Sequence, residues 1–545
     1  MARVPITMTR FGLLGRRKTG DLNLAFALFL AVAIGGLVRF LPIWSSMYPL
    51  NDGGLFAHMA SDLAKNGFLL PAFTTYNGEQ IPFAYPPLGL YLTAIISVFA
   101  GSDTMAVVRL LPAALSTASI LALYLMAAEL LRSRWRGVVA AAAFALMPHS
   151  YLWLIVGGGV TRSLGLLLSL LALQQGLRML RTHRLGHALA TAMLGGLTLL
   201  SHPQAAAFLT VSLLTFLAFH VFRGRGVMAI AQLALAGLGG LVVAGPWLVA
   251  VLAKHGSQPI LSAGASALDP ASGASQLLGL AFADGSVLDL MTALGVLGIV
   301  VRIARGQWMI PVWLMFTIFI DPRAGANYAT VPLALSVVPI FGELLQRMVP
   351  AQGRSARLTR EPMPSLVRTH RAASVVVLLV LFVTLRTASR TAVDPASPLH
   401  GLEVDHVAAM QWVRSDAGDN AAFAVVTGRS WESDYLSEWF PVLAERTSIA
   451  TVQGSEWTGI ESFLTRLAMY RELQDCATAT ATCLESWTDG WHATGAYVFL
   501  PKGQLFGPTS PTDCCPALRE TLRESTHYRV IYDGPGATIF APADR

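Results

Sequence analysis

The chain has 545 residues, of which 54% are hydrophobic and only 13% are charged. Soluble domains carry about 25% charged residues, and apolar runs long enough to cross about 30 Å of hydrocarbon recur along most of this chain. The composition therefore excludes a soluble globular protein and predicts a polytopic α-helical membrane protein.

Acidic and basic residues divide unevenly along the chain. Residues 389–545 hold 20 of the 32 acidic and 11 of the 39 basic residues, a net charge of −9, whereas residues 1–388 carry +16. The basic clusters lie in short loops between apolar runs, where positive charge marks the cytoplasmic side, so the overall charge of +7 does not indicate nucleic-acid binding. We expect a transmembrane module over 1–388 and an extracytoplasmic domain over 389–545.

The basic loops also predict how the chain crosses the membrane. RFGLLGRRKTG at 10–20 precedes the first apolar run, about 22–43, so the N-terminus is expected in the cytoplasm. That run lacks the small-x-small cleavage pattern of a signal peptide and is expected to remain as an anchor. Keeping the later basic loops inside gives further spans near 105–131, 137–156, 164–180, 188–201, 203–222, 227–252, 286–301, 307–320, 329–345 and 372–388. About eleven spans, an odd number, put the C-terminal domain of this multi-pass cell-membrane protein outside.

One short apolar segment, 86–101, is not counted as a span. If it crossed the membrane, every later basic loop would be inverted, so we expect it to lie at the membrane surface or to re-enter. The first outer loop then runs from about 44 to 104, which is too long for a mere connector.

The C-terminal residues mix strand and helix patterns. Strands are expected at 422–427, 496–500, 528–533 and 537–541, and helices at 404–415, 458–474 and 514–525. These elements predict a small α/β domain. All four cysteines lie in it, and in an outer compartment two disulfides are expected, with four reduced thiols as the alternative. We expect the adjacent Cys514 and Cys515 to bond to two different partners.

Charged side chains on the outer side are the candidates for chemistry. Asp52 follows the first span, Arg162 lies in GGGVTRSLG, and Arg323 lies in DPRAGANY. An arginine at the membrane surface needs a partner, and a lipid phosphate is a good one. Asp52 could instead cap the helix that follows it, and Arg162 could extend to the lipid headgroups. Asp62 is expected to be a solvated surface acid.

The order of elements resembles that of the GT-C glycosyltransferases, in particular the protein O-mannosyltransferase and aminoarabinose-transferase branch. In that family an Asp at the start of the first outer loop, often followed by Glu, is the catalytic or acceptor-orienting acid; Asp52 matches it, although Gly53 follows. A Pro-Pro-Leu motif is matched by Pro86 and the two residues after it. Tyr85 stands where the aminoarabinose enzymes have Lys.

The resemblance also implies a site for the lipid phosphate. Late in the bundle of the family, an Arg followed by an aromatic residue and Pro helps to hold that phosphate. Arg323, Tyr328 and Pro332 form a loose version of this pattern.

A polyprenyl-phosphate sugar has a good leaving group, so its site needs a base for the acceptor hydroxyl and positive charge for the released phosphate. Asp52 is the predicted base, and Arg323 and Arg162 are the predicted phosphate ligands. Attack opposite the phosphate inverts the anomeric carbon. The expected partners are this donor, the bilayer, and an acceptor that is a glycan, a lipid or a protein.

Three further residues are weaker candidates for substrate contact. His58 has packing or a surface role as its alternative, and the alternative for His202 in SHPQ is a tight turn between two spans. Glu438 could line an acceptor groove, or it could cap and pack the small domain.

No metal-ligand spacing stands out, so a divalent cation such as Mg²⁺ or Mn²⁺ is left open, and there is no nucleotide-binding motif. The alternative function is a transporter or lipid flippase. The long first loop, the outer domain and the lack of duplicated halves argue against it, and a sensor or adhesion scaffold would not explain the many spans.

Overall fold

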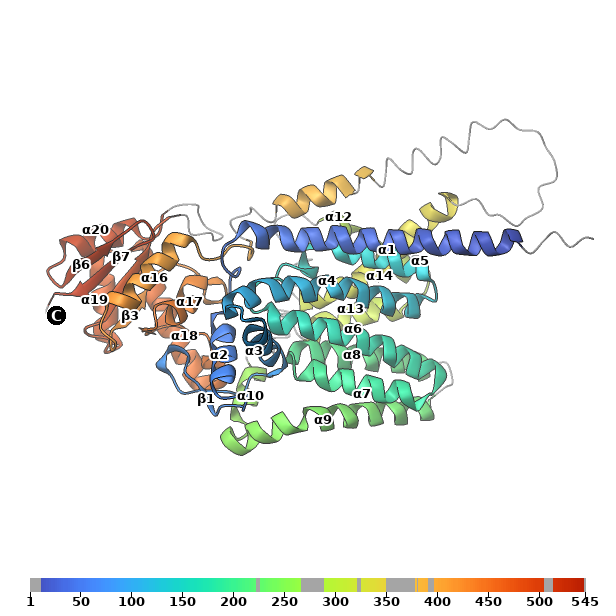
Figure 1. Ribbon diagram of the computed structural model, residues 1–545, viewed down its shortest axis with the longest axis horizontal. Helices are drawn as coiled ribbons and strands as arrows, with labels where there is room; N and C mark the ends of the chain where they lie inside the picture. The colour runs from blue at the N-terminus through green and yellow to red at the C-terminus, as the bar shows by residue number, and fades with distance from the viewer. Residues whose placement is uncertain are drawn as a thin grey trace, which may run out of the picture.

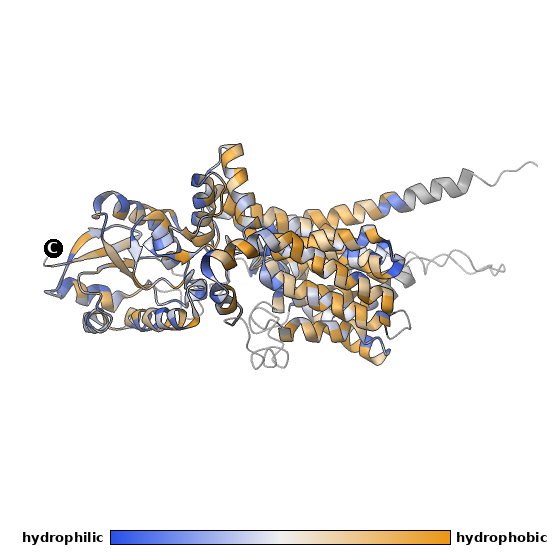
Figure 2. Ribbon diagram, turned by 90° about the horizontal axis from the view of Figure 1, so that it is seen from below, coloured by the Kyte–Doolittle hydropathy of each residue, from blue (hydrophilic) through white to orange (hydrophobic). Residues whose placement is uncertain are grey.

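The computed structural model shows a helical bundle joined end to end with a small α/β domain (Figure 1). The residues it describes are 11–221, 226–265, 289–320, 325–348, 378–379, 381–390, 397–503 and 513–543. Hydrophobic residues predominate along the helices of the bundle, whereas the α/β domain alternates hydrophilic and hydrophobic segments (Figure 2).

Among these residues, five helices are long and apolar enough to cross a membrane. They are Asp21–Ser45 within α1 (Phe11–Ser45), α4 (Thr104–Leu131), α6 (Gly159–Thr182), α8 (Pro203–Val221) and α9 (Val227–His255). The other helices of the bundle are α5 (Arg134–Leu146), α7 (Leu185–Leu199), α12 (Leu290–Ala304), α13 (Met309–Ile320) and α14 (Gly325–Met348). The total of eleven spans stays a prediction, because 286–301 and 372–388 lie partly outside the described residues.

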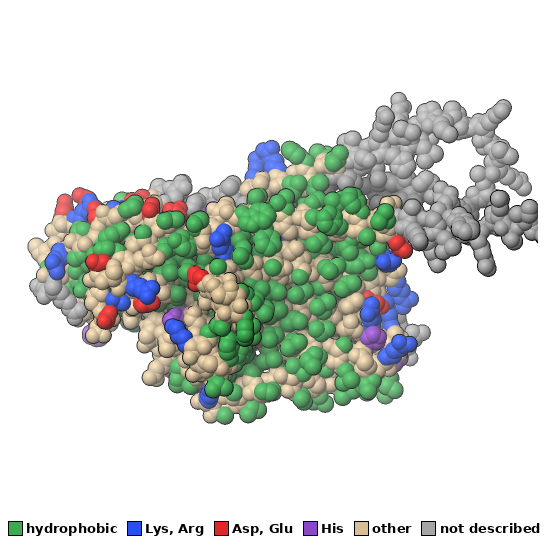
Figure 3. Space-filling model, viewed as in Figure 1, with side chains coloured by type: hydrophobic (Ala, Val, Ile, Leu, Met, Phe, Trp, Pro, Cys, Tyr) green, Lys and Arg blue, Asp and Glu red, His purple; other side chains and the backbone are tan. Residues whose placement is uncertain are grey.

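The outer surface of the bundle suits contact with lipid. Val242 of α9 is 76% exposed and Phe26 of α1 is 60% exposed, and hydrophobic side chains cover the visible face of the bundle (Figure 3). An apolar surface of this extent on a folded protein marks an interaction with a membrane or another protein.

Close packing and a few polar contacts hold the helices together. A side chain at Gly298 of α12 would overlap the backbone of Ser336 in α14, so the two helices approach closely there. The fully buried Arg39 of α1 donates to Ser116 Oγ on α4 (2.8 Å) and to the carbonyl oxygen of Ala145 on α5 (2.9 Å). These bonds satisfy a cation that would otherwise be costly inside a bundle.

The charged loops gather at the end of the bundle away from the α/β domain (Figure 3). At that end Glu129 accepts hydrogen bonds from Arg178 and Arg181, and Arg134 pairs with Asp21 at 2.9 Å. The start of α6 and the end of α1 lie at the opposite end, next to the α/β domain (Figure 1).

The first loop folds against that opposite end. It contains α2 (Gly54–Lys65), a hairpin of β1 (Phe73–Thr74) and β2 (Ile81–Pro82), and α3 (Leu88–Ala100). Helix α3 packs against α2, α4 and α6, and its 13 residues rise only about 20 Å, less than the hydrocarbon thickness. The expected surface position of 86–101 stays a prediction, because helices of similar length, α5 and α13, lie within the bundle.

Asp62 was expected to be solvated, and this prediction is wrong. Its side chain is 7% exposed and accepts hydrogen bonds from Thr74 Oγ1 (2.6 Å), from the amide of Thr75 (3.0 Å) and from Thr75 Oγ1 (2.8 Å). The turn that brings the hairpin back over α2 supplies these donors. Asp62 therefore fastens the hairpin to α2.

The C-terminal part is built on a five-stranded sheet in the order β4-β3-β5-β7-β6. Its strands are β3 (Ala422–Val425), β4 (Thr447–Ser448), β5 (Tyr497–Pro501), β6 (Tyr528–Asp533) and β7 (Ala537–Pro542). β3 pairs in parallel with β4 and β5, and β7 pairs antiparallel with β5 and β6. Its α-helices are α16 (Val404–Asp416), α17 (Tyr435–Leu443), α18 (Ile460–Asp475), α19 (Ala481–Gly490) and α20 (Pro516–Glu524).

The expected mixed α/β fold of this part is confirmed, and the expected number of disulfides is present. Their pairing differs from the prediction: Cys476 bonds to Cys483, and Cys514 bonds to Cys515. A short helical turn at 476–478 brings the first two cysteines together. Cys514 and Cys515 lie elsewhere, at the start of α20 and beside the carbonyl oxygen of Val426, so the remaining partner of each is its neighbour.

Candidate active site

Asp52 lies where the first loop, the start of α6 and the α/β domain meet. It directly precedes Gly53, the N-cap of α2, which has a φ of 115° and no capping side chain. Only glycine adopts such a backbone conformation at low cost. The carboxylate of Asp52 is directed away from α2, so the interpretation of Asp52 as a cap for this helix does not hold.

The carboxylate of Asp52 is bound by the start of α6. Asp52 Oδ1 accepts a hydrogen bond from the amide of Gly158 (2.8 Å), and Oδ2 forms an ion pair with Nη2 of Arg162. Both side chains are 18% exposed. Since Arg162 turns inward to Asp52, it does not extend to headgroups as the alternative supposed. An acid, an arginine and a helix N-terminus thus meet in one accessible place.

Two glycines allow this close approach. A Cβ at Gly157 would overlap the carbonyl oxygen of Asp52, and a Cβ at Gly158 would lie 2.7 Å from Asp52 Oδ2. The amide of Gly157 also donates to the carbonyl oxygen of Leu50 (2.9 Å). The run of three glycines at 157–159, where α6 begins, is the sequence signal for this contact, because free amides at a helix start bind anions. Sequence reasoning used that segment only to single out Arg162.

Glu438 reaches the same loop from the α/β domain. Its Oε1 accepts from the amides of Gly53 (2.9 Å) and Leu55 (3.2 Å), and it is only 4% exposed. Burial and the nearby Asp52 raise the pKa of Glu438 to about 8. Glu438 therefore caps α2, rather than lining an open groove or capping a helix of its own domain.

Tyr85 contacts the same turn of α6 as Arg162. Its hydroxyl lies 3.1 Å from Thr161 Oγ1, and its ring packs edge-on against Phe56 (4.8 Å) and Trp457 (5.5 Å). Burial raises the pKa of Tyr85 to about 12. The neutral hydroxyl is thus kept as a hydrogen-bonding group beside Arg162.

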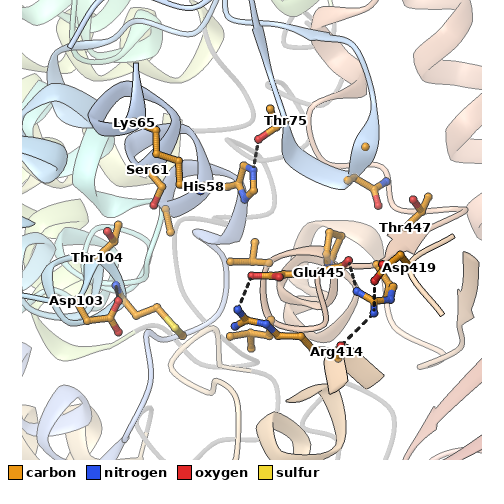
Figure 4. Close-up of a pocket in the computed structure, with 18 residues that line it drawn as sticks. His58, Ser61, Lys65, Thr75, Asp103, Thr104, Arg414, Asp419, Glu445 and Thr447 are labelled. Carbon is orange, nitrogen blue, oxygen red and sulfur yellow. Dashed lines mark hydrogen bonds and ion pairs between the residues drawn. The ribbon is translucent and has the colours of Figure 1, made fainter. Parts of the chain in front are cut away.

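His58 belongs to a different surface. Its Nε2 lies 2.7 Å from Thr75 Oγ1 and 3.7 Å from Asp62 Oδ1, and burial lowers its pKa. Its ring lines a cavity of about 660 Å³ between α2 and the α/β domain, with Lys65 and Arg414 also on its walls (Figure 4). Asp52 does not line this cavity.

Of the remaining candidates, the two that the structure describes, Tyr328 and His202, do not join Asp52. Tyr328 of α14 is 4% exposed in the bundle core and stacks on Phe208 of α8 at 4.9 Å. His202 is buried in the turn between α7 and α8, next to Gly165, which agrees with the tight-turn interpretation. Arg323 lies outside the described residues. Within the described part of the chain, no cluster of three or more His, Cys, Asp or Glu side chains suits a metal ion.

A comparison with known protein families gives a match for part of the chain. Residues 84–249 match the family model described as dolichyl-phosphate-mannose-protein mannosyltransferase. This match includes Tyr85, the glycine run and Arg162. No curated protein sequence matches the chain.

Solved structures share the fold at low sequence identity. The oligosaccharyltransferase of Archaeoglobus fulgidus, tethered to an acceptor peptide, matches with a TM-score of 0.56 and 14% identity over 88% of this chain and 69% of its own. ArnT from Cupriavidus metallidurans, bound to undecaprenyl phosphate, matches with a TM-score of 0.53 and 14% identity. The match covers 94% of this chain and 97% of ArnT. The arabinofuranosyltransferase AftD from Mycobacteria matches with a TM-score of 0.54 and 15% identity. The match covers 94% of this chain but only 40% of AftD.

These matches confirm the predicted resemblance. The chain is a multi-pass membrane protein with a GT-C-like fold, and its match to the mannosyltransferase family model is confined to residues 84–249. A further structure of the Archaeoglobus fulgidus enzyme is described as a complex with Zn and sulfate, at a TM-score of 0.51. The ion belongs to that structure, and no divalent cation is assigned to the present chain.

Proposed function

We propose that this protein transfers one monosaccharide from a polyprenyl-phosphate donor to a hydroxyl acceptor, with inversion, on the extracytoplasmic side of the cell membrane. The observation that carries the proposal is the Asp52–Arg162 ion pair at the N-terminus of α6. It combines a base with a phosphate-binding group in one partly buried place within a GT-C-like fold.

Asp52 has the role of general base in this reaction. The acceptor oxygen attacks the anomeric carbon, and its proton passes to the Asp52 carboxylate. The bond between the anomeric carbon and the phosphate oxygen breaks, and the polyprenyl phosphate leaves with the electron pair. Because attack comes from the side opposite the phosphate, the anomeric configuration inverts. No acid is needed to protonate this leaving group, since phosphate is already a good one.

Arg162 and the first amides of α6 have the role of phosphate ligands. A guanidinium group and a helix N-terminus both stabilise the charge that grows on the departing phosphate. Tyr85, beside Arg162, contributes a hydrogen bond to the phosphate. Arg323 is a further phosphate ligand, as the family resemblance of the sequence implies. Two structural neighbours are described as bound to a lipid phosphate, dolichol-phosphate or undecaprenyl phosphate, which is the kind of group that would leave in this reaction.

The proposal includes the orientation of the protein in the membrane. The basic loops mark the cytoplasmic side, so the opposite end, with Asp52 and the domain 389–545, is extracytoplasmic. Residues 1–388 form the transferase module. The acceptor is a glycan, a lipid or a protein.

Purified protein in nanodiscs tests this function. It is given radiolabelled polyprenyl-phosphate monosaccharides, or sugar nucleotides as a control donor, with total membrane extract as the acceptor. Transfer from a lipid donor and none from sugar nucleotides is expected. If no donor supports transfer, but labelled lipid moves between the leaflets of proteoliposomes, the function is that of a transporter.

Arg162→Lys is expected to weaken donor use while leaving the fold intact. Arg162 Nε also donates to the carbonyl oxygen of Gly158 (3.4 Å), which fixes the guanidinium plane. Lysine keeps the charge but loses this second contact and the fork geometry. A hydrogen bond to a charged group contributes about 1.5–3 kcal/mol, so the donor KM should rise at least about tenfold. Steady-state kinetics check this, and an unchanged KM would remove Arg162 from donor binding.

Donor binding is also expected to weaken at alkaline pH. With a raised pKa of about 8, Glu438 is mostly neutral at about pH 7 and becomes charged as the pH rises through about 8. The charged groups that face it are Asp52 and Arg162, and the hydroxyl of Tyr76 donates to its backbone carbonyl (2.7 Å). The added negative charge repels the donor phosphate.

The donor KM of the wild type should therefore rise roughly tenfold between about pH 7 and pH 9, the effect of about 1.4 kcal/mol of repulsion. The Glu438→Gln variant cannot ionise at this position, so its KM should stay level over that range. Equal pH profiles for the two proteins would contradict the assignment of this titration to Glu438.

A further inference from the structure

The backbone on both sides of Asp52 is bound by two consecutive residues of α17. On the N-terminal side, Trp439 Nε1 donates to the carbonyl oxygen of Asn51 (2.9 Å). On the C-terminal side, Glu438 accepts from the amides of Gly53 and Leu55. Trp439 is fully buried. The loop that carries Asp52 is therefore held from the α/β domain, about 385 residues away along the chain.

The Asp52 loop and α17 are packed so closely that a side chain would not fit between them. A Cβ at Gly54 would lie 2.8 Å from the carbonyl oxygen of Glu438. That same oxygen accepts the hydroxyl of Tyr76 from the first loop (2.7 Å). The carbonyl oxygen of His400, in the segment leading to α16, accepts from the amide of Asn51 (2.7 Å). The loop is thus bonded to the C-terminal part at several backbone positions.

Helix α17 is itself anchored in its domain. Asp434 caps it by accepting from the amide of Ser437 (3.1 Å). The other carboxylate oxygen of Asp434 accepts from Thr427 Oγ1, just after β3, and from the hydroxyl of Tyr470 on α18, both at 2.7 Å. A displacement of the α/β domain would therefore move α17, and α17 would move the Asp52 loop.

We propose that the α/β domain is a positioning part of the active site, in which Glu438 and Trp439 hold the backbone around Asp52 so that its carboxylate faces Gly158 and Arg162. The inference rests on the proposed function for the role of Asp52. Glu438 and Trp439 do not touch the substrate; they act through the loop. Transfer then requires the bundle and the α/β domain to be docked together.

Hydrogen exchange of peptides that cover residues 50–56, measured on the full chain in nanodiscs, tests directly whether Glu438 and Trp439 hold the Asp52 loop. Loss of the acceptor in Glu438→Ala, or of the indole donor in Trp439→Phe, should speed exchange of these amides about tenfold or more. Glu438→Gln should restore protection, because its amide oxygen still accepts from Gly53 and Leu55. Glu445→Gln, on the exposed end of the same segment, is the matched control and should leave exchange unchanged.

Kinetics supply the second readout. In Glu438→Ala the kcat should fall about 10- to 100-fold with the donor KM within about threefold, since a displacement of about 1 Å costs about that factor in rate. Glu438→Gln should stay within a few-fold of wild type at about pH 7. A glutamine variant as defective as the alanine variant, or a loss confined to KM, would overturn the positioning role.

The two readouts separate this inference from the proposed function. Exchange at 50–56 does not depend on any activity. Unchanged protection in both Glu438→Ala and Trp439→Phe would overturn the inference even in an active enzyme. If the two variants lose protection but the wild type transfers no sugar, the contacts of Glu438 and Trp439 with the Asp52 loop are supported and the proposed function is refuted.

Discussion

Asp52→Asn should lower the kcat of sugar transfer by about 100- to 10,000-fold, the range that general base catalysis contributes. Asparagine has nearly the same shape, and its side-chain oxygen can still accept from the amide of Gly158. It cannot take the proton of the acceptor hydroxyl. Since Arg162 remains in place, the dissociation constant of the donor should change only several-fold. Single-turnover kinetics and a donor-binding titration in nanodiscs check both expectations.

Asp103→Asn is the matched control for this change. Asp103 caps α4, where its side chain accepts from the amide of Met105 (3.3 Å), and it is exposed. Its substitution should leave kcat near the wild-type value. Equal turnover in Asp52→Asn and wild type would remove Asp52 from the chemistry.

Gly157→Ala should abolish most of the activity through geometry alone. The new methyl group would overlap the carbonyl oxygen of Asp52 and would lie 3.0 Å from Gly53 Cα, so the Asp52 loop must move. All of these neighbours are backbone atoms that cannot rotate away. A displacement of about 1 Å at a reacting group costs about 100-fold in rate, and kcat should fall by at least that factor. The variant is measured beside the wild type in the same transfer assay.

Gly186→Ala separates this steric effect from a general effect of alanine. Gly186 lies at the start of α7 with no atom within 4 Å of the new methyl group. Its substitution should preserve activity and leave thermal stability equal or slightly higher. An active Gly157→Ala enzyme would mean that the Asp52 loop adapts freely, which contradicts a site that depends on its position.

The bundle was largely predictable from the sequence because each apolar run and basic loop is a local signal. Helices α4, α6, α8 and α9 lie close to their expected limits. The longer strands of the α/β domain were predicted for the same reason. Strand β4 was missed because it has only two residues.

Contacts between distant segments were not predictable. Asp52 and Arg162 were both named from their local surroundings, but no pattern showed that they form an ion pair 110 residues apart in the chain. Glu438 was also named, yet its bond to the amide of Gly53 depends on how the α/β domain docks. Gly53 itself stands where the resembled family often has Glu, and here the carboxyl group next to its amide is that of Glu438.

Other candidates were drawn from types of residue that also build cores and turns. Tyr328 fitted an aromatic pattern, but it stacks on Phe208 in the core of the bundle. His58 is bound to the hairpin of the first loop. A sequence shows which polar or aromatic residue is unusual for its place, and only the packing shows whether it faces substrate or structure.

The anomeric configuration of the product is the most direct test of the central claim. Wild-type protein is given a polyprenyl-phosphate sugar of known anomeric form, and the transferred sugar is analysed by NMR. The account predicts a product of the opposite configuration, formed in equal amount with free polyprenyl phosphate. A product that retains the donor configuration, or release of the lipid without any glycosylated acceptor, would contradict a single inverting attack assisted by Asp52.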